Sequence, residues 1–75
     1  MKNRLKDLRI DRDLSQEELA KKIFCSQRVY SHYENGTRSI PLEVLINLAN
    51  FYNVSIDYIL YRTNNKEINK EKIDN

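Results

Sequence analysis

Apolar residues recur at spacings of three and four along most of the chain, and Gly and Pro occur once each. This period indicates α-helices, and the near absence of the two residues that interrupt helices predicts an all-α fold. A first helix is predicted at about residues 3–12, with Leu5 and Leu8 on one face and Arg9 beside them. Asp13 follows where the chain must turn, and aspartate tolerates the left-handed backbone conformation better than most residues.

Ser15 marks the start of a second helix. Glu18 lies three residues later, which is the pattern of a capping box, and the acidic first turn suits the helix dipole. Leu19 and Ile23 supply its buried face. This helix is predicted to end near Phe24.

A third helix is predicted over residues 27–35, with Ser26 as its N-cap and Gly36 as its stop. Only the dipeptide "FC" and the capping serine separate it from the second helix. Two short helices joined by so tight a turn cross steeply, which is helix-turn-helix geometry.

The second half of the chain predicts two more helices and a polar tail. Pro41 suits the first position of a fourth helix, and Ser55 caps a short fifth helix over "SIDYILYR". We expect one domain over residues 1–62 and a tail over residues 63–75 that is a frayed helix or disordered. The apolar period of the fourth helix is set by five residues: Leu42, Leu45, Leu48, Ala49 and Tyr52.

Composition narrows the class of protein. A single Cys and a single His exclude an internal disulfide and a zinc site of the usual kind, and favour a reduced, cytoplasmic protein. No apolar run is long enough for a signal peptide or a membrane span. Residues 1–40 carry nine Lys or Arg and six Asp or Glu, against an overall net charge of +2. The basic part is therefore the first half, although an ordinary solvated surface also explains this distribution.

The segment "SQRVYSHYENG" divides into two sides on a helix. One side is apolar or aromatic; the other carries hydrogen-bonding groups, on Gln27, Arg28, Ser31 and His32. The major groove of B-DNA admits one α-helix, and its base edges present donors and acceptors that Gln and Arg bond bidentately. This helix is therefore a candidate for reading DNA; plain solvent exposure of the four residues is the alternative.

Three stretches, "LSQEELAKKI", "SQRVYSHYENG" and "PLEVLINLANFYNVSIDYIL", together resemble the phage-repressor, Cro/C1-type (XRE) family of helix-turn-helix domains, from about residue 5 to 60. The resemblance implies a compact five-helix, lambda-repressor-like fold. It implies a sequence-specific transcriptional regulator, a repressor that binds a palindromic operator in double-stranded DNA as a dimer. No cofactor, metal, small-molecule ligand or membrane is expected.

The resemblance also assigns roles to residues. It implies base contacts from Gln27, Arg28 and His32, with Ser31 as a further candidate. Gln16 would contact the DNA backbone and brace Gln27; a role only at the start of its helix is the alternative. It implies further phosphate contacts from Asn35, Thr37 and Arg38, for which a plain turn is the alternative. It implies an ion pair between Arg9 and Glu34 that fixes the third helix on the body; two solvated surface charges are the alternative.

Two positions depart from the family pattern. Phe24 stands in the turn where the family usually has glycine, so the backbone there must take a positive φ with a bulky residue, or the turn differs. Tyr30 replaces the usual aliphatic residue, and its hydroxyl needs a partner or water.

The apolar faces of the predicted helices define the expected core. Cys25 is expected to be a small apolar filler. Ser31 and His32 are neighbours on a helix and cannot form a nucleophile–base pair, so no enzyme is predicted. The predicted core is Leu5, Leu8, Leu19, Ile23, Val29, Tyr30, Tyr33, Leu45, Leu48 and Ile59.

The C-terminal part of the domain is more apolar than a small monomer needs, which predicts a homodimer through the C-terminal helix. Two other functions stay open: a protein-interaction module, antitoxin-like or an anti-repressor subunit, and a general nucleic-acid coat. The residues of this apolar surface are Phe51, Ile56, Tyr58 and Tyr61.

Overall fold

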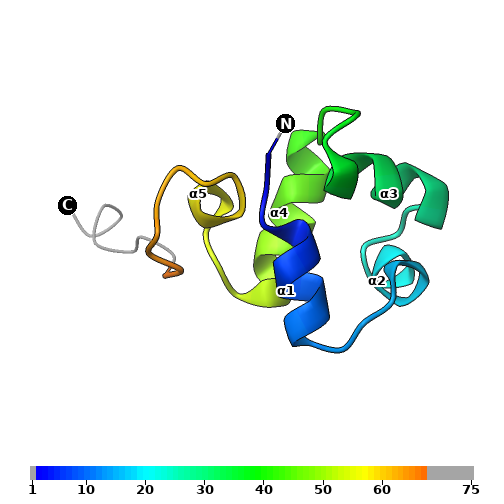
Figure 1. Cartoon of the computed structure of the whole chain (residues 1–75), viewed down its shortest axis with the longest axis horizontal. Helices are drawn as coiled ribbons and strands as arrows, with labels where there is room; N and C mark the ends of the chain where they lie inside the picture. Colours follow the sequence, from blue (N-terminus) through cyan, green and yellow to red (C-terminus); the bar gives the residue numbers. More distant parts are fainter. Residues whose placement is uncertain (1, 68–75) are drawn as a thin grey trace.

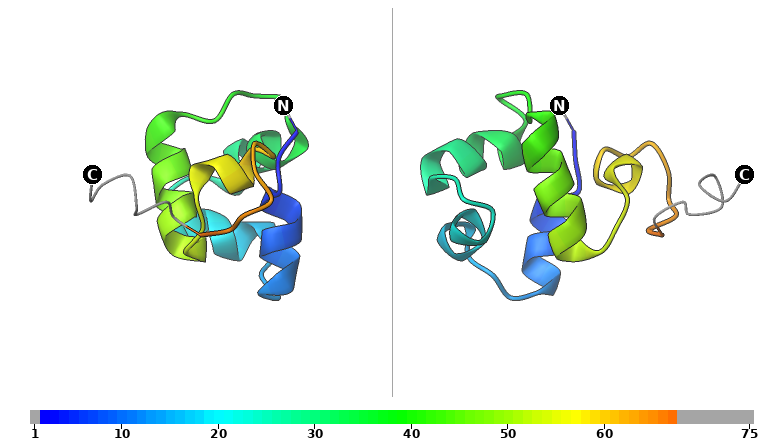
Figure 2. Two further views of the ribbon diagram at one scale, coloured as in Figure 1. Left: turned by 90° about the vertical axis from the view of Figure 1, so that its left-hand side faces the viewer. Right: turned by 180° about the vertical axis from the view of Figure 1, so that it is seen from behind.

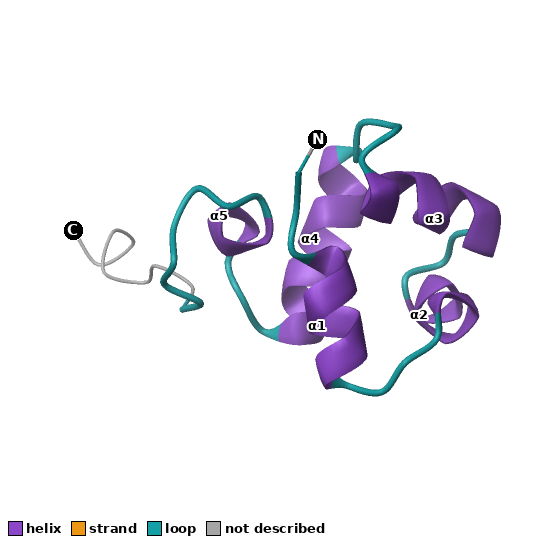
Figure 3. Ribbon diagram, viewed as in Figure 1, coloured by secondary structure: helices purple, strands orange, loops and turns teal. Residues whose placement is uncertain are grey.

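The computed structural model describes residues 2–67, and within that range it contains helices and no strands. The predicted all-α, five-helix fold is confirmed (Figure 3). The helices are α1 (Leu5–Asp11), α2 (Gln16–Lys22), α3 (Gln27–Asn35), α4 (Leu42–Tyr52) and α5 (Ile56–Ile59). Figure 1 shows α1 and α4 in the middle of the long axis, α2 and α3 at one end and α5 at the other, and the rear view in Figure 2 agrees. No helix in the described range is long and apolar enough to cross a bilayer.

Serine caps begin three of the five helices, as predicted. Ser15 Oγ accepts from the backbone N–H of Glu18 at 3.0 Å, and Glu18 Oε1 accepts from the N–H of Ser15 at 2.8 Å, which completes the capping box. Ser26 and Ser55 accept in the same way from the residue three positions later. Gly36 ends α3 in the left-handed conformation, with φ of 79°.

Several predicted helix ends are wrong by a few residues, and the backbone shows why. Phe24 has φ of 62°, which no α-helix continues through, so α2 ends at Lys22 and not near residue 24. Tyr61 has φ of 61° and stops α5 well before residue 62. Pro41 is not the first helical residue but the N-cap, because its ψ of 150° is extended. Asp13 takes the predicted left-handed turn, with φ of 56°.

The core agrees with the predicted faces in most positions. Leu8 and Val29 are only half-buried, at the edge of the core, and Leu42 is 65% exposed. The buried residues of α4 therefore begin at Leu45, with Val44 before it half-buried against the core. The buried residues are Leu5, Leu19, Ala20, Ile23, Tyr30, Tyr33, Ile40, Leu45, Leu48, Ala49, Tyr52, Val54 and Ile59.

Arg4 joins the start of the domain to its end. Its guanidinium stacks on the rings of Tyr58 and Tyr61, at 4.2 and 4.1 Å from the ring centroids. It also donates to the Tyr58 carbonyl at 2.8 Å and to Asn64 Oδ1 at 2.9 Å. Residues 63–67 form a loop that includes this contact, and the rest of the predicted tail, residues 68–75, lies outside the described residues.

The turn between α2 and α3 holds a bulky residue in a conformation that favours glycine. The Phe24 side chain is 90% exposed, so it contributes almost no packing that offsets the strain. A non-glycine residue in the left-handed region costs about 1–2 kcal/mol.

Phe24→Gly is therefore expected to stabilise the domain. Relief of the strain outweighs the extra freedom that glycine gives the unfolded chain, for a net gain of about 0.5–1 kcal/mol in the free energy of unfolding. Urea denaturation followed by circular dichroism measures it. Phe24→Ala is the matched control, because it removes the ring but keeps the Cβ atom. An equal gain in both variants would assign the effect to the exposed ring and not to the backbone.

Candidate nucleic-acid interface

The helix α3 presents its two sides to different environments. Tyr30 and Tyr33 are buried in the core, whereas Gln27 and Arg28 are exposed and Ser31 is half-buried. His32, also half-buried, lies one turn after Arg28. Gln27 and Ser31 are four positions apart, as are Arg28 and His32, so these two neighbouring rows occupy one flank of the helix. This flank offers amide, guanidinium, hydroxyl and imidazole groups to a partner.

The helices α2 and α3 pack directly against each other. In Figure 1, α2 is seen almost end-on while α3 lies in the plane of the view, so the two cross steeply. The turn is closed by backbone hydrogen bonds from Phe24 to Lys21 and from Cys25 to Ala20. This is the predicted helix-turn-helix geometry.

A buried carboxylate holds α3 to both preceding helices. Glu34 on α3 accepts from Arg9 on α1 twice, at 2.9 and 3.2 Å. It accepts from Gln16 Nε2 on α2 at 2.7 Å and from the hydroxyl of Tyr30 at 3.0 Å. The side chains of Arg9 and Glu34 are 13% and 4% exposed, so the pair is buried and not a surface contact. The orientation of α3 is therefore fixed by four residues from three helices, which we call the Glu34 cluster.

Gln16 was expected to brace Gln27, and the structure places its amide on Glu34 instead. A carboxylate is the stronger acceptor, because a hydrogen bond to an ionised group is roughly twice as strong as one between neutral groups. The contact that the structure shows for this amide is thus with Glu34. An amide has two N–H donors and one carbonyl acceptor, so this bond leaves Gln16 with a donor for a further partner.

The sequence predicts that the hydroxyl of Tyr30 needs a partner or water. It donates to Glu34, four residues later on the same helix. Burial also raises the pKa of the Tyr30 phenol, so it stays a donor over the whole physiological range. The i,i+4 spacing of the two residues is the signal by which the sequence could have revealed this bond.

Two carboxylates titrate below the usual value of 4.5 in the folded state. Burial of Glu34 raises its pKa, but the hydrogen bonds from Arg9, Gln16 and Tyr30 outweigh burial and lower it. The hydrogen bonds with Ser15 lower the pKa of Glu18.

Stability is consequently expected to fall in acid. A group whose pKa is lower in the folded state stabilises the fold above its unfolded pKa and loses that contribution as the pH falls through the folded pKa. The free energy of unfolding should therefore decrease as the pH falls below about 4.5. Denaturation curves of the wild type and Glu34→Gln over a pH series measure this, and the gap between them should narrow in acid. A constant gap would contradict the role assigned to ionised Glu34.

Asn35, the last residue of α3, and the loop after it are the further candidates for phosphate contacts. Asn35 Nδ2 donates weakly to Ser31 Oγ at 3.4 Å, and Arg38 is exposed. The backbone N–H of Thr37 donates to the His32 carbonyl at 3.0 Å, and the Thr37 hydroxyl donates to the same oxygen at 3.3 Å. Both donors of Thr37 are thus directed to His32. The phosphate contact implied for Thr37 would require one of these donors to leave His32.

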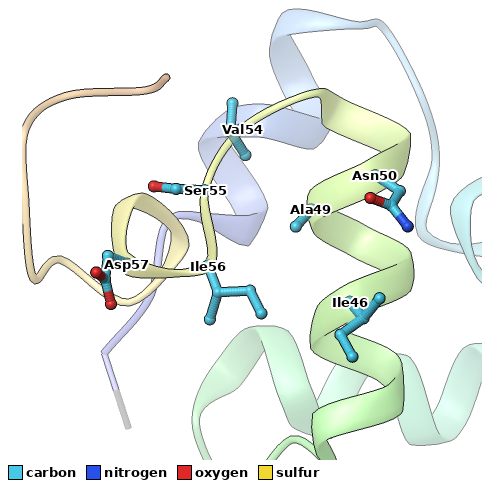
Figure 4. Close-up of a pocket in the computed structure, with 7 residues that line it drawn as sticks. All are labelled: Ile46, Ala49, Asn50, Val54, Ser55, Ile56 and Asp57. Carbon is cyan, nitrogen blue, oxygen red and sulfur yellow. The ribbon is translucent and has the colours of Figure 1, made fainter. Parts of the chain in front are cut away.

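A second surface lies at the opposite end, between α4 and α5. Figure 4 shows Ile46 and Ala49 on α4 and Ile56 on α5 lining an open, largely apolar pocket of about 350 Å³. Ile46 is 42% exposed. Of the residues expected to form a partner surface, Ile56 lines this pocket. Tyr58 and Tyr61 were expected in the same partner surface, but the Arg4 guanidinium already stacks on both of their rings.

Cys25 lies in the turn before α3 and is half-buried. Burial raises the pKa of its thiol, which disfavours the reactive thiolate. This agrees with the predicted role of a small apolar filler.

Five short helices around one core, with α2 and α3 crossing over a tight turn, define a helix-turn-helix domain. The family model described as helix-turn-helix matches residues 5–59, and the chain belongs to this family, of the XRE type. No solved structure matches the chain.

Curated relatives extend over nearly the whole chain. The cryptic phage CTXphi transcriptional repressor RstR of Vibrio cholerae is 42% identical over 95% of this chain and 66% of that protein. The uncharacterized HTH-type transcriptional regulators YobD and YqaE of Bacillus subtilis are 39% and 34% identical, over 92% and 85% of this chain. The chain spans 66%, 62% and 55% of the lengths of these three relatives.

Proposed function

We propose that this chain is a sequence-specific, double-stranded-DNA-binding transcriptional regulator, and that it acts as a repressor. The observation that carries the proposal is the exposed polar flank of α3, held at a fixed angle by the buried Glu34 cluster. A flexible or covered helix could not present the same groups to successive base pairs. The names of the relatives, one of them a transcriptional repressor, support the same function.

In this proposal α3 enters the major groove. Gln27 and Arg28, near the start of the helix, bond base edges, and His32 reads a further position, with Ser31 beside them. Around the groove, the phosphate contacts come from Gln16, Asn35 and Arg38. Such contacts position the protein without reading sequence. The proposed repression is steric, because a protein bound over an operator blocks polymerase.

The proposal includes a homodimer through the face formed by α4 and α5. One small module buries too little surface to bind an operator tightly at physiological salt, and two copies reading half-sites about 34 Å apart remove this limit. The apolar pocket at Ile46 and Ile56 supports this surface as the contact.

A gel-shift series tests the function. The wild type is titrated with its selected operator and with random DNA at several salt concentrations. Site-dependent affinity is expected. Equal, strongly salt-dependent binding of all DNA would favour a nucleic-acid coat, and no binding would favour a protein-interaction module.

Ile46→Lys is expected to weaken dimerisation, because it places a charge in the proposed apolar contact. Sedimentation with and without operator measures the effect, and operator affinity should fall with it. Ile10→Lys is the matched control, since Ile10 is 51% exposed on α1, away from this pocket. A wild type that stays monomeric both free and on its operator would reject the dimer.

A further inference from the structure

The loop after α3 is tied to the side chain of His32. Thr37 Oγ1 lies 2.8 Å from His32 Nδ1 and 3.3 Å from the backbone carbonyl oxygen of His32. The Thr37 N–H donates to that same carbonyl at 3.0 Å. One threonine therefore contacts both the imidazole and the backbone that carries it, and this holds the ring in one orientation on the exposed flank of α3.

These contacts decide which ring nitrogen carries the proton. A threonine hydroxyl has one proton to donate and can accept through its lone pairs. If it donates to the carbonyl, it accepts from Nδ1–H, and both contacts are hydrogen bonds. If it donates to Nδ1, the hydroxyl and carbonyl oxygens face each other at 3.3 Å through lone pairs alone. The first arrangement is favoured, and in a neutral imidazole it leaves Nε2 as an acceptor.

We infer that Thr37 is a positioning residue that makes neutral His32 a hydrogen-bond acceptor toward DNA, so that the base read by His32 is adenine or cytosine. The inference rests on the proposed function, in which α3 enters the major groove. Adenine N6 and cytosine N4 are the donors that bases present there, whereas guanine O6 and N7 and thymine O4 are acceptors. An acceptor at Nε2 can therefore form a hydrogen bond with adenine or cytosine. Against guanine or thymine it faces another acceptor, and no hydrogen bond forms.

Nitrogen NMR tests the tautomer directly. The sequence contains a single histidine, so every imidazole nitrogen signal comes from His32. In alkaline buffer, where the ring is neutral, the proton is expected on Nδ1. Thr37→Val, of nearly the same shape but without the hydroxyl, should shift the proton toward Nε2, and Thr37→Ser should keep it on Nδ1. A wild-type ring with its proton on Nε2 would overturn the inference.

Selection from a randomised DNA library tests the base. His32→Ala identifies the position that His32 reads, as the one whose preference disappears. The wild type should select adenine or cytosine there, and Thr37→Val should lower this discrimination by up to about tenfold, the value of one hydrogen bond. Thr37→Ser should retain it.

The outcomes separate the inference from the function on which it rests. Selection of guanine or thymine at this position, or unchanged discrimination in Thr37→Val, overturns the inference and leaves the proposed regulator intact. A His32→Ala variant with unchanged preferences at every position also overturns it. If the wild type selects no sequence at all, the proposed function fails with it.

Discussion

Glu34→Gln is expected to destabilise the domain by about 3–5 kcal/mol, the usual cost of removing one partner from a buried ion pair. The substitution keeps the shape of the side chain but removes the charge that Arg9, Gln16 and Tyr30 all contact. Arg9 is then left as a buried cation without its carboxylate. A chain of this length has a total stability of only about 4–11 kcal/mol, so much of it would be lost. Urea denaturation of both proteins measures the difference.

Two matched variants show whether burial is the cause. Glu17 forms the corresponding pair on the surface, with Lys21 at 4.0 Å and side chains 66% and 78% exposed. Glu17→Gln should therefore change stability by at most about 1 kcal/mol. Tyr30→Phe removes one of the four hydrogen bonds to Glu34 and should cost about 0.5–1.5 kcal/mol. If Glu34→Gln is too unstable to measure in water, sulfate restores enough stability for the comparison. Equal effects of the Glu34 and Glu17 changes would refute the buried cluster.

The cluster also shows what the sequence could predict about this site. Local patterns identify helix starts, because a capping serine acts within three residues of its own position. They also identify the polar flank of α3, since helical period alone separates Arg28 from Tyr30. The partner of Gln16 was not predictable in this way. Gln27 and Glu34 both lie on the next helix, and the choice between them depends on how α2 and α3 cross.

Contacts between distant parts of the chain were missed for a related reason. Arg4 is separated from Tyr58 and Asn64 by more than fifty residues, and no local period connects them. Val54 and Ile40 are buried in loops, where helical periodicity gives no signal. The turn at Phe24 is different, because the missing glycine itself indicated a positive φ. The departure from the family pattern at Phe24 was thus informative, and of the distant contacts the resemblance supplied the Arg9–Glu34 pair, whereas helical periodicity revealed none.

Arg28→Ala is expected to have the largest effect on operator binding. A bidentate contact from arginine to guanine is worth about 1–3 kcal/mol of discrimination. In the proposed dimer Arg28 contacts DNA once in each half-site, so the loss for a palindromic operator is expected to be about 2–6 kcal/mol when the two contacts add. The fold should be unaffected, because Arg28 is exposed and lies outside the Glu34 cluster. Binding isotherms on the operator and on its point variants measure the loss and show which base position is relaxed.

Arg38→Ala distinguishes sequence-specific base contacts from nonspecific electrostatic attraction to DNA. Arg38 is an exposed cation in the loop after α3, and in the proposed complex it contacts phosphate. Its removal should weaken binding to every sequence by a similar factor and reduce the salt dependence by about one unit for each copy in the complex. Arg28→Ala should instead abolish the preference at one base position while random DNA binds nearly as before. If both variants lost affinity equally on operator and random DNA, α3 would be attracting DNA by its charge and not reading its bases.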